Sequence, residues 1–247
     1  MQQLSDGRDR FDRRAFCKAA GVAGVATAVG VVEASLGSVL AHADLTKEQR
    51  DKMTADEIIQ QMKAGNERFR SGKPRNRDLM REAKATAKGQ YPAAIVFSCV
   101  DSRAPAELVL DFGIGDIFSG RVAGNVADED ALGSMEFACK VAGSKVVLVM
   151  GHTGCGAIKG AIDEVQLGNL TALLAKIRPA VEATQYTGER SAKNYGFVDA
   201  VARKNVSLTI ANIREKSPVL RDLESSGSIK IAGSMYNLET GTVEFLA

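Results

Sequence analysis

The stretch KVVLVMGHTGCG, at residues 145–156, joins a short apolar run to a glycine-rich polar turn. The apolar half is rich in β-branched residues and has the length of a strand that is buried on both faces. Two earlier runs have the same character, at residues 93–98 and 117–122. A helical pattern separates the second and third runs at 128–142, and further helical patterns continue to residue 223. Strands that alternate with helices predict an α/β fold with a mostly parallel sheet.

The end of the chain predicts one more pair of strands. Residues 229–235 and 242–246 are apolar runs on either side of a turn at 238–241, which is the pattern of a hairpin. We therefore expect a single α/β domain whose central sheet has about four parallel strands plus an antiparallel C-terminal edge strand.

A helix is predicted before the first strand. Residues 46–70 show helical periodicity, and Gly72-Lys73-Pro74 ends it. Its apolar side comprises Ile58, Ile59, Met62 and Phe69. Because this helix precedes every strand, we expect it to pack outside the core or on a partner subunit.

Polar residues with metal-binding side chains follow two of the predicted strands. Cys99 comes directly after the first, and His152 and Cys155 follow the third. The carboxyl ends of parallel strands meet at one edge of a sheet, where ligands bind. Thiolates and imidazole are the ligands that zinc prefers, and three of them leave a tetrahedral ion one open position, as in catalytic sites. The sequence therefore predicts a catalytic Zn²⁺ site.

Other residues near these motifs have competing interpretations. A lone cysteine is often a small buried hydrophobe, and we interpret Cys139, within the helical pattern at 128–142, in this way. Asp101 and Arg103 could form an ordinary surface ion pair. Beside a metal, an ionised Asp101 could instead orient a zinc-bound water or occupy the fourth zinc position itself.

The first 43 residues have the layout of a signal peptide. An uncharged run at 19–32 follows the basic segment, and Ala41-His42-Ala43 supplies small residues for cleavage. Residues 12–18 resemble the twin-arginine export motif. A Sec signal or an uncleaved anchor is the alternative. The basic residues of the segment are Arg8, Arg10, Arg13, Arg14 and Lys18.

We expect cleavage to leave residues 44–247 as one domain, exported and most simply periplasmic. The uncharged run ends at Glu33 and falls short of the about 20 residues that a spanning helix needs, so no stable membrane insertion is expected after cleavage. The 32 basic and 30 acidic residues nearly cancel, and no basic cluster is interleaved with aromatics, so we expect no nucleic-acid partner.

The two polar motifs resemble the signature of beta-class carbonic anhydrases. They are CVDSR at 99–103 and HTGCG at 152–156, and the resemblance extends over about residues 55–245, nearly all of the expected mature chain. It implies zinc-dependent reversible hydration of carbon dioxide to bicarbonate and a proton. It also implies an α/β/α subunit that assembles through its N-terminal helix and sheet edge into a homodimer or homotetramer.

The resemblance also implies a role for each residue of the site. Cys99, His152 and Cys155 would hold Zn²⁺, and Asp101 and Arg103 would form a catalytic dyad. Gln90, shortly before the first predicted strand, matches a family glutamine that binds substrate in the neighbouring subunit's pocket.

Three alternatives stay open at this point. A related hydrolase acting on carbonyl sulfide or carbon disulfide would keep every ligand. A non-catalytic zinc-binding paralogue would bind metal without turnover, although a merely structural zinc site needs neither Asp101 nor Arg103. A thiol redox protein would need a Cys-x-x-Cys motif, which the sequence lacks.

Overall fold

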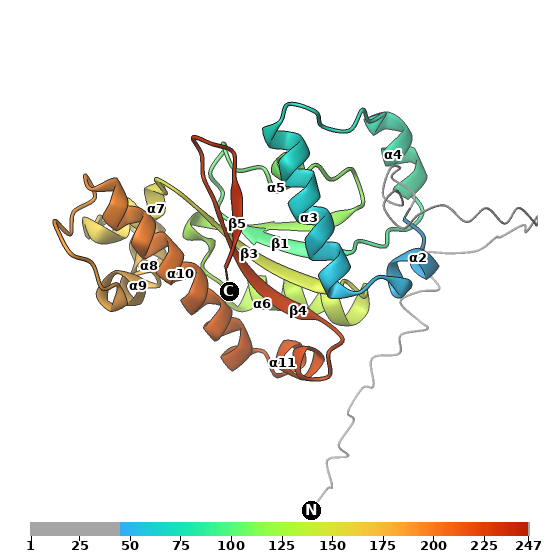
Figure 1. Ribbon diagram of the computed structural model, residues 1–247. Helices are drawn as coiled ribbons and strands as arrows, with labels where there is room; N and C mark the ends of the chain where they lie inside the picture. Colours follow the sequence, from blue (N-terminus) through green and yellow to red (C-terminus); the bar gives the residue numbers. More distant parts are fainter. Residues whose placement is uncertain (1–44, 247) are drawn as a thin grey trace, which may run out of the picture.

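A five-stranded sheet forms the centre of the computed structural model, which describes residues 45–246 (Figure 1). The strand order is β2-β1-β3-β4-β5; the first four strands are mutually parallel and β5 runs antiparallel to β4. This topology confirms the predicted fold class, and the predicted signal peptide lies outside the described residues. The strands are β1 (Ala94–Ser98), β2 (Ile117–Arg121), β3 (Val146–His152), β4 (Lys230–Tyr236) and β5 (Val243–Phe245).

Helices cover both faces of the sheet (Figure 1). In the order of the chain they are α2 (Lys47–Lys52), α3 (Ala55–Arg70), α4 (Leu79–Thr86), α5 (Ala106–Val109), the short η1 (Ala123–Asn125), α6 (Glu129–Glu136), the π-helical η2 (Phe137–Val141), α7 (Gly156–Ile162), α8 (Gly168–Ala175), α9 (Arg178–Ala183), α10 (Tyr195–Lys216) and α11 (Pro218–Ser225).

Alternating side chains of the central strands divide the core into two layers. In β1, Ile95 and Phe97 pack toward the face that carries α6 and α10. Ala94 and Val96 pack toward the face that carries α3 and α5. Strands β1 and β3 are buried along their whole length, which is why they are continuous apolar runs in the sequence.

The register of β1 and β3 brings their ends together. Ser98 of β1 lies opposite Met150 of β3, so Cys99 leaves β1 beside the last residues of β3. His152 is the final residue of β3 and Cys155 immediately precedes α7. The parallel sheet thus places the two predicted polar motifs at one edge.

The N-terminal helical region differs from the prediction in two respects. It is two helices, because Thr46 and Thr54 each begin a new helix with a capping box. The apolar side of α3 packs within its own chain, where Ile58 and Met62 are fully buried, so the expectation that it lies outside the core is wrong. Packing of this helix on a partner subunit stays a prediction.

Later helices follow the predicted pattern. The expected interruption near 185–188 falls between α9 and α10, and Ser217-Pro218 separates α10 from α11. Helix α4, capped by Asp78, was not predicted. Among the described residues, no helix combines the length and the apolar character required to cross a membrane.

Candidate metal centre

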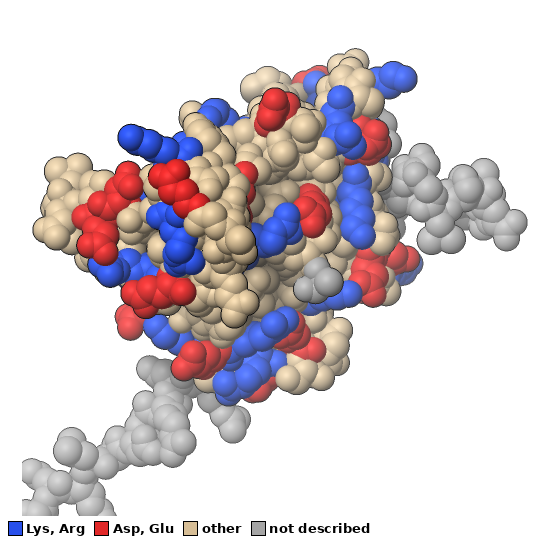
Figure 2. Space-filling model, turned by 60° about the vertical axis from the view of Figure 1, so that its left-hand side comes forward, with Lys and Arg blue, Asp and Glu red and all other residues tan. Residues whose placement is uncertain are grey.

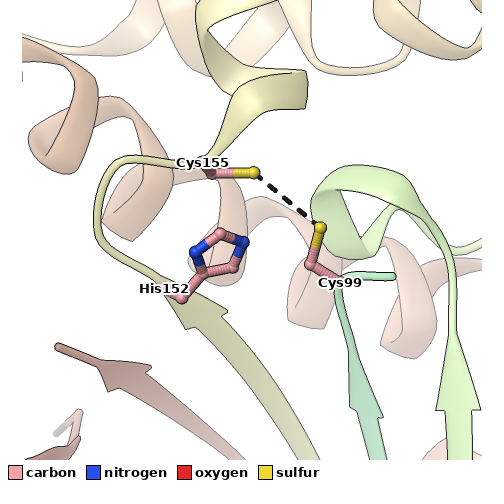
Figure 3. A group of neighbouring side chains, drawn as sticks. All are labelled: Cys99, His152 and Cys155. Carbon is pink, nitrogen blue, oxygen red and sulfur yellow. Dashed lines mark hydrogen bonds between the residues drawn. The ribbon is translucent and has the colours of Figure 1, made fainter. Parts of the chain in front are cut away.

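Cys99, His152 and Cys155 converge at the carboxyl edge of the sheet (Figure 3). All three are buried, with exposed fractions of 4%, 1% and 2%. Their ligand atoms lie within 4.8 Å of one another, and the Sγ atoms of Cys99 and Cys155 are 3.9 Å apart. Two sulfurs bound tetrahedrally to zinc at about 2.3 Å would be separated by about 3.8 Å. The spacing of the two sulfurs therefore fits a shared zinc ion.

The ring of His152 is oriented as a metal ligand would be. Its Nδ1 lies 2.9 Å from the carbonyl oxygen of Thr153, so Nδ1–H donates to that carbonyl and Nε2 keeps its lone pair. Nε2 is one of the buried side-chain polar atoms that have no hydrogen-bond partner within residues 45–246. A zinc ion accepts the lone pair of an imidazole nitrogen that is held in this way.

The backbone between His152 and Cys155 makes a tight turn. Gly154 has a φ of +61°, in the left-handed region that favours glycine. This conformation lets one short turn direct both side chains to the same point. The carboxylate of Asp199 accepts a hydrogen bond from the Gly154 amide at 2.8 Å.

The two thiols influence each other's ionisation. The hydrogen bond from Cys155 lowers the pKa of Cys99, and the amide N–H of Gly124, 3.3 Å from the Cys99 sulfur, adds to this effect. The same contact with Cys99, together with burial, raises the pKa of Cys155. Before metal binds, the Cys155 thiol therefore donates to the Cys99 thiolate, and binding of a metal ion by both sulfurs would displace the Cys155 proton into solvent.

Histidine 152 responds to the same thiolate. Burial works against the charged imidazolium, but the negative charge of the neighbouring Cys99 outweighs burial and raises the pKa of His152. The buried cluster therefore favours a positive group between its sulfurs. A divalent cation satisfies that preference.

Asp101 and Arg103 form a bidentate pair beside the ligands. Arg103 donates from Nε to Oδ1 at 2.9 Å and from Nη2 to Oδ2 at 2.7 Å, and its backbone amide also donates to Oδ1. These hydrogen bonds hold the pKa of Asp101 well below its usual range. Oδ2 of Asp101 lies 3.8 Å from Nε2 of His152, so an ionised carboxylate stands next to the metal ligands.

Arg121 fixes the loop that carries Cys99 and Asp101. Its guanidinium donates to the carbonyl oxygen of Cys99 at 2.9 Å and also to that of Asp101. The sequence analysis did not assign Arg121 to the site. Its place at the end of a strand parallel to β1 was the available signal, because ends of neighbouring parallel strands meet.

A pocket opens on the solvent side of the Asp101–Arg103 pair. It has a volume of about 530 Å³, and its lining includes Asp101, Arg103, Gly154, Tyr195 and Asp199. Lys159 also lines it and lies 3.8 Å from the ring centre of Tyr195. The dyad is thus reached from solvent, whereas the three ligands are buried.

Two other predicted residues lie apart from this cluster. Gln90 is exposed and precedes the first residue of β1, whereas Cys99 follows the last, so one chain does not bring Gln90 to its own metal ligands. Cys139 is buried in the core, and burial raises the pKa of its thiol to about 12. The interpretation of Cys139 as a core residue is confirmed.

Comparison with known proteins agrees with this geometry. Residues 94–243 match the family model described as carbonic anhydrase. Carbonic anhydrase 2 of Mycobacterium tuberculosis is 34% identical over 73% of this chain and 87% of its own length. The carbonic anhydrase of Mycolicibacterium smegmatis is 33% identical over 74% of this chain and 89% of its own.

Solved structures show the same fold. Tetrameric beta-carbonic anhydrases of Sordaria macrospora superpose with a TM-score of 0.59 at 22% identity, covering 68% of this chain and 90% of the other. The Coccomyxa beta-carbonic anhydrase, solved with acetazolamide, has a TM-score of 0.59 at 22% identity and covers 77% of this chain and 82% of its own. The chain therefore belongs to the beta-class carbonic anhydrase family.

Proposed function

We propose that this protein catalyses the reversible hydration of carbon dioxide to bicarbonate and a proton at a zinc ion held by Cys99, His152 and Cys155. One observation carries the proposal: the buried ligand triad stands next to a carboxylate that an arginine keeps ionised. A purely structural zinc site needs no such pair. When bound, zinc supplies a Lewis acid that makes water a nucleophile near neutral pH.

The chain's own residues supply orientation. The carboxylate of Asp101 accepts hydrogen bonds, and with Arg103 occupying one side it presents its remaining lone pairs toward His152. In that position it can align the attacking water and keep a proton directed away from the incoming carbon dioxide. Arg103 is the positioning residue for Asp101 because its fork fixes both carboxylate oxygens.

The proton that hydration releases must be carried away by a group other than His152. His152 is the one histidine among residues 45–246, and its two nitrogens are committed to the metal and to the Thr153 carbonyl. A histidine shuttle is therefore absent from the described part of the chain. We expect buffer or a carboxylate at the pocket to take the proton.

The substrate pocket is proposed to be completed by a second subunit. Gln90 is exposed and remote from the ligands of its own chain, which suits a side chain that enters the pocket of a partner. We propose a homodimer or homotetramer in which Gln90 binds the substrate of the neighbouring site. The Sordaria macrospora proteins named above are described as tetrameric.

The surface suits a small neutral substrate. On the face shown in Figure 2, basic and acidic side chains are intermingled rather than gathered by sign. Carbon dioxide carries no charge and needs no electrostatic attraction to reach the pocket.

One assay tests the proposal against its nearest rivals. Zinc content and carbon dioxide hydration are measured on the purified protein, with carbonyl sulfide and carbon disulfide hydrolysis measured in parallel. Zinc with rapid hydration supports the proposal. Zinc with hydrolysis of the sulfur compounds alone would identify the related hydrolase, zinc without any turnover would identify the non-catalytic paralogue, and protein without zinc would refute the metal centre.

We also propose that residues 1–43 direct export to the periplasm, by the twin-arginine route. The adjacent Arg13 and Arg14 before an uncharged run support this. Fusion of residues 1–43 to a reporter should give periplasmic reporter, and Arg13→Lys with Arg14→Lys should abolish it. Unchanged export of the double variant would favour the Sec route.

A further inference from the structure

Helix α10 contacts both halves of the metal centre. It packs against β3, β4, α7 and η1, and its apolar side, which includes Phe197 and Val201, is fully buried in the core. Two polar side chains of the same helix, Asp199 and Asn205, are directed to peptide groups next to the thiolate ligands. These two hydrogen bonds are separate from the apolar contacts that hold α10 in the core.

Asp199 holds the turn between His152 and Cys155. Its Oδ1 accepts the amide N–H of Gly154 at 2.8 Å, and no other acceptor for this amide is found among the described residues. Gly154 adjoins Cys155 and lies two residues after His152. The carboxylate therefore fixes the peptide that separates the two ligands.

Asn205 holds the opposite side through one intermediate residue. Its Nδ2 donates to the carbonyl oxygen of Gly124 at 2.7 Å, and the amide of Gly124 donates to the sulfur of Cys99 at 3.3 Å. Asn205 is buried, with 3% of its surface exposed. Gly124 has a φ of +66°, and a Cβ there would meet Ile177 at 2.6 Å, so this position requires glycine.

We propose that α10 sets the geometry of the metal centre, with Asp199 and Asn205 as positioning residues for the Cys155 and Cys99 sides. This inference rests on the zinc site proposed above. Ligands are held in place by the hydrogen bonds of the groups around them, and loss of such a bond lowers metal affinity by about 10- to 100-fold. Asp199 acts through its acceptor oxygen, which asparagine also carries.

The choice of variants separates the hydrogen bond from the charge. Asp199→Ala removes both, whereas Asp199→Asn keeps an oxygen that can accept from Gly154. Asp199 is half-buried at the pocket, so the fold should tolerate both changes. Asn205→Ala tests the second contact.

Thr209→Val is the matched control. Thr209 lies one turn beyond Asn205 on the same helix and donates to the carbonyl oxygen of Asn125 at 3.2 Å. Like the Asn205 bond, it runs from a side chain of α10 to a backbone carbonyl. The amide of Asn125, unlike that of Gly124, donates to no ligand sulfur within residues 45–246. The control reports the cost of losing a buried helix-to-loop hydrogen bond.

The experiment measures zinc affinity by competition with a chelator, and the visible spectrum of the cobalt-substituted protein. Asp199→Ala and Asn205→Ala should bind zinc about 10- to 100-fold more weakly, with altered cobalt–thiolate bands. Asp199→Asn and Thr209→Val should stay within about threefold of the unaltered protein. Thermal unfolding of the metal-free variants shows whether the affinity losses accompany loss of fold.

Wild-type affinity and spectrum in Asp199→Ala would overturn the inference, as would an equal loss in Asp199→Asn. Should Asn205→Ala not fold, the two Asp199 variants decide the matter alone. Absence of zinc from the unaltered protein would instead refute the metal centre itself, so the two failures are distinguishable.

Discussion

The carboxylate of Asp101 lies 3.8 Å from Nε2 of His152 while two side-chain hydrogen bonds from Arg103 hold it on its other side. The charged carboxylate of Asp101 thus lies next to the metal ligand His152, but its hydrogen bonds with Arg103 keep it from binding the metal itself. Asp101 would have to give up both bonds with Arg103 to occupy the fourth zinc position. In this structure Arg103 holds Asp101, and in this arrangement the fourth position of a bound zinc ion would be left to water or substrate.

Removal of one ligand should abolish the metal site. Cys155→Ser is expected to reduce zinc to less than one tenth of the wild-type content and to remove hydration, because a serine hydroxyl is a poor zinc ligand compared with a thiolate. Metal analysis of the purified protein checks this. Cys139→Ser is the control, since Cys139 lies in the core and away from the cluster. Equal zinc in both variants would contradict the assignment of Cys155.

Substitution of Asp101 should slow hydration without moving zinc. Asp101→Asn removes the ionised acceptor that orients the attacking water, and we expect kcat to fall by about 100-fold, as for loss of precise positioning. Zinc content should match that of the unaltered protein. A variant with wild-type kcat would show that Asp101 has no part in the reaction.

The pH profile should follow the metal centre and not Asp101. Arg103 lowers the pKa of Asp101 in the folded state, so this carboxylate stays ionised above its unfolded pKa and loses its stabilising effect only as pH falls through the lower, folded value. Two thiolates leave zinc less able to acidify water than neutral ligands would. Hydration should therefore rise between about pH 6 and 9, and Asp101→Asn should keep this rise. A flat profile in the unaltered protein would contradict the prediction.

The strand ends were predictable because the signals are local. Each central strand is a continuous apolar run, and the residues that leave it are adjacent in sequence. The rule that parallel strands end at one edge then brings Cys99 to His152 without knowledge of the helices. The same reasoning would have reached Arg121 at the end of β2.

The helical contacts to the site were not predictable in this way. Asp199 is 45 residues from Gly154, and their hydrogen bond depends on how α10 packs on β3. The break between α2 and α3, by contrast, had a signal in the sequence. Threonine followed three residues later by Gln49 or Glu57 is the pattern of a capping box at both helices.

Loss of Arg77, which pairs with buried acids, should destabilise the fold strongly. Arg77 pairs with Glu82 at 3.2 Å and approaches Asp116 at 3.5 Å, and the side chains of both acids are less than a tenth exposed. Arg77→Ala removes a positive charge that pairs with both acids and leaves them with backbone donors, so urea unfolding at fixed protein concentration should show a loss of about 3–5 kcal/mol.

The control for this prediction is an exposed pair on α3. Arg70 bonds Glu67 at 2.8 Å, but 38% and 67% of their side chains are exposed. Arg70→Ala should change the free energy of unfolding by less than about 1 kcal/mol, because water already solvates both charges. Equal losses for Arg77→Ala and Arg70→Ala would contradict a role for burial.

A mixed oligomer should reveal whether Gln90 serves the neighbouring subunit. Gln90→Ala alone should lower hydration while zinc stays bound, and Cys155→Ser alone should lack zinc. When the two variants are refolded together, the zinc-loaded Gln90→Ala subunit regains an intact Gln90 from its Cys155→Ser partner, so that one site becomes complete. Activity should then exceed the sum of the two separate variants. Gln90 precedes β1 and Cys99 follows it, so Gln90 lies away from the ligands of its own chain. A Gln90 that served its own site would give no such gain, and simple additivity on mixing would show that Gln90 has no part in the partner's reaction.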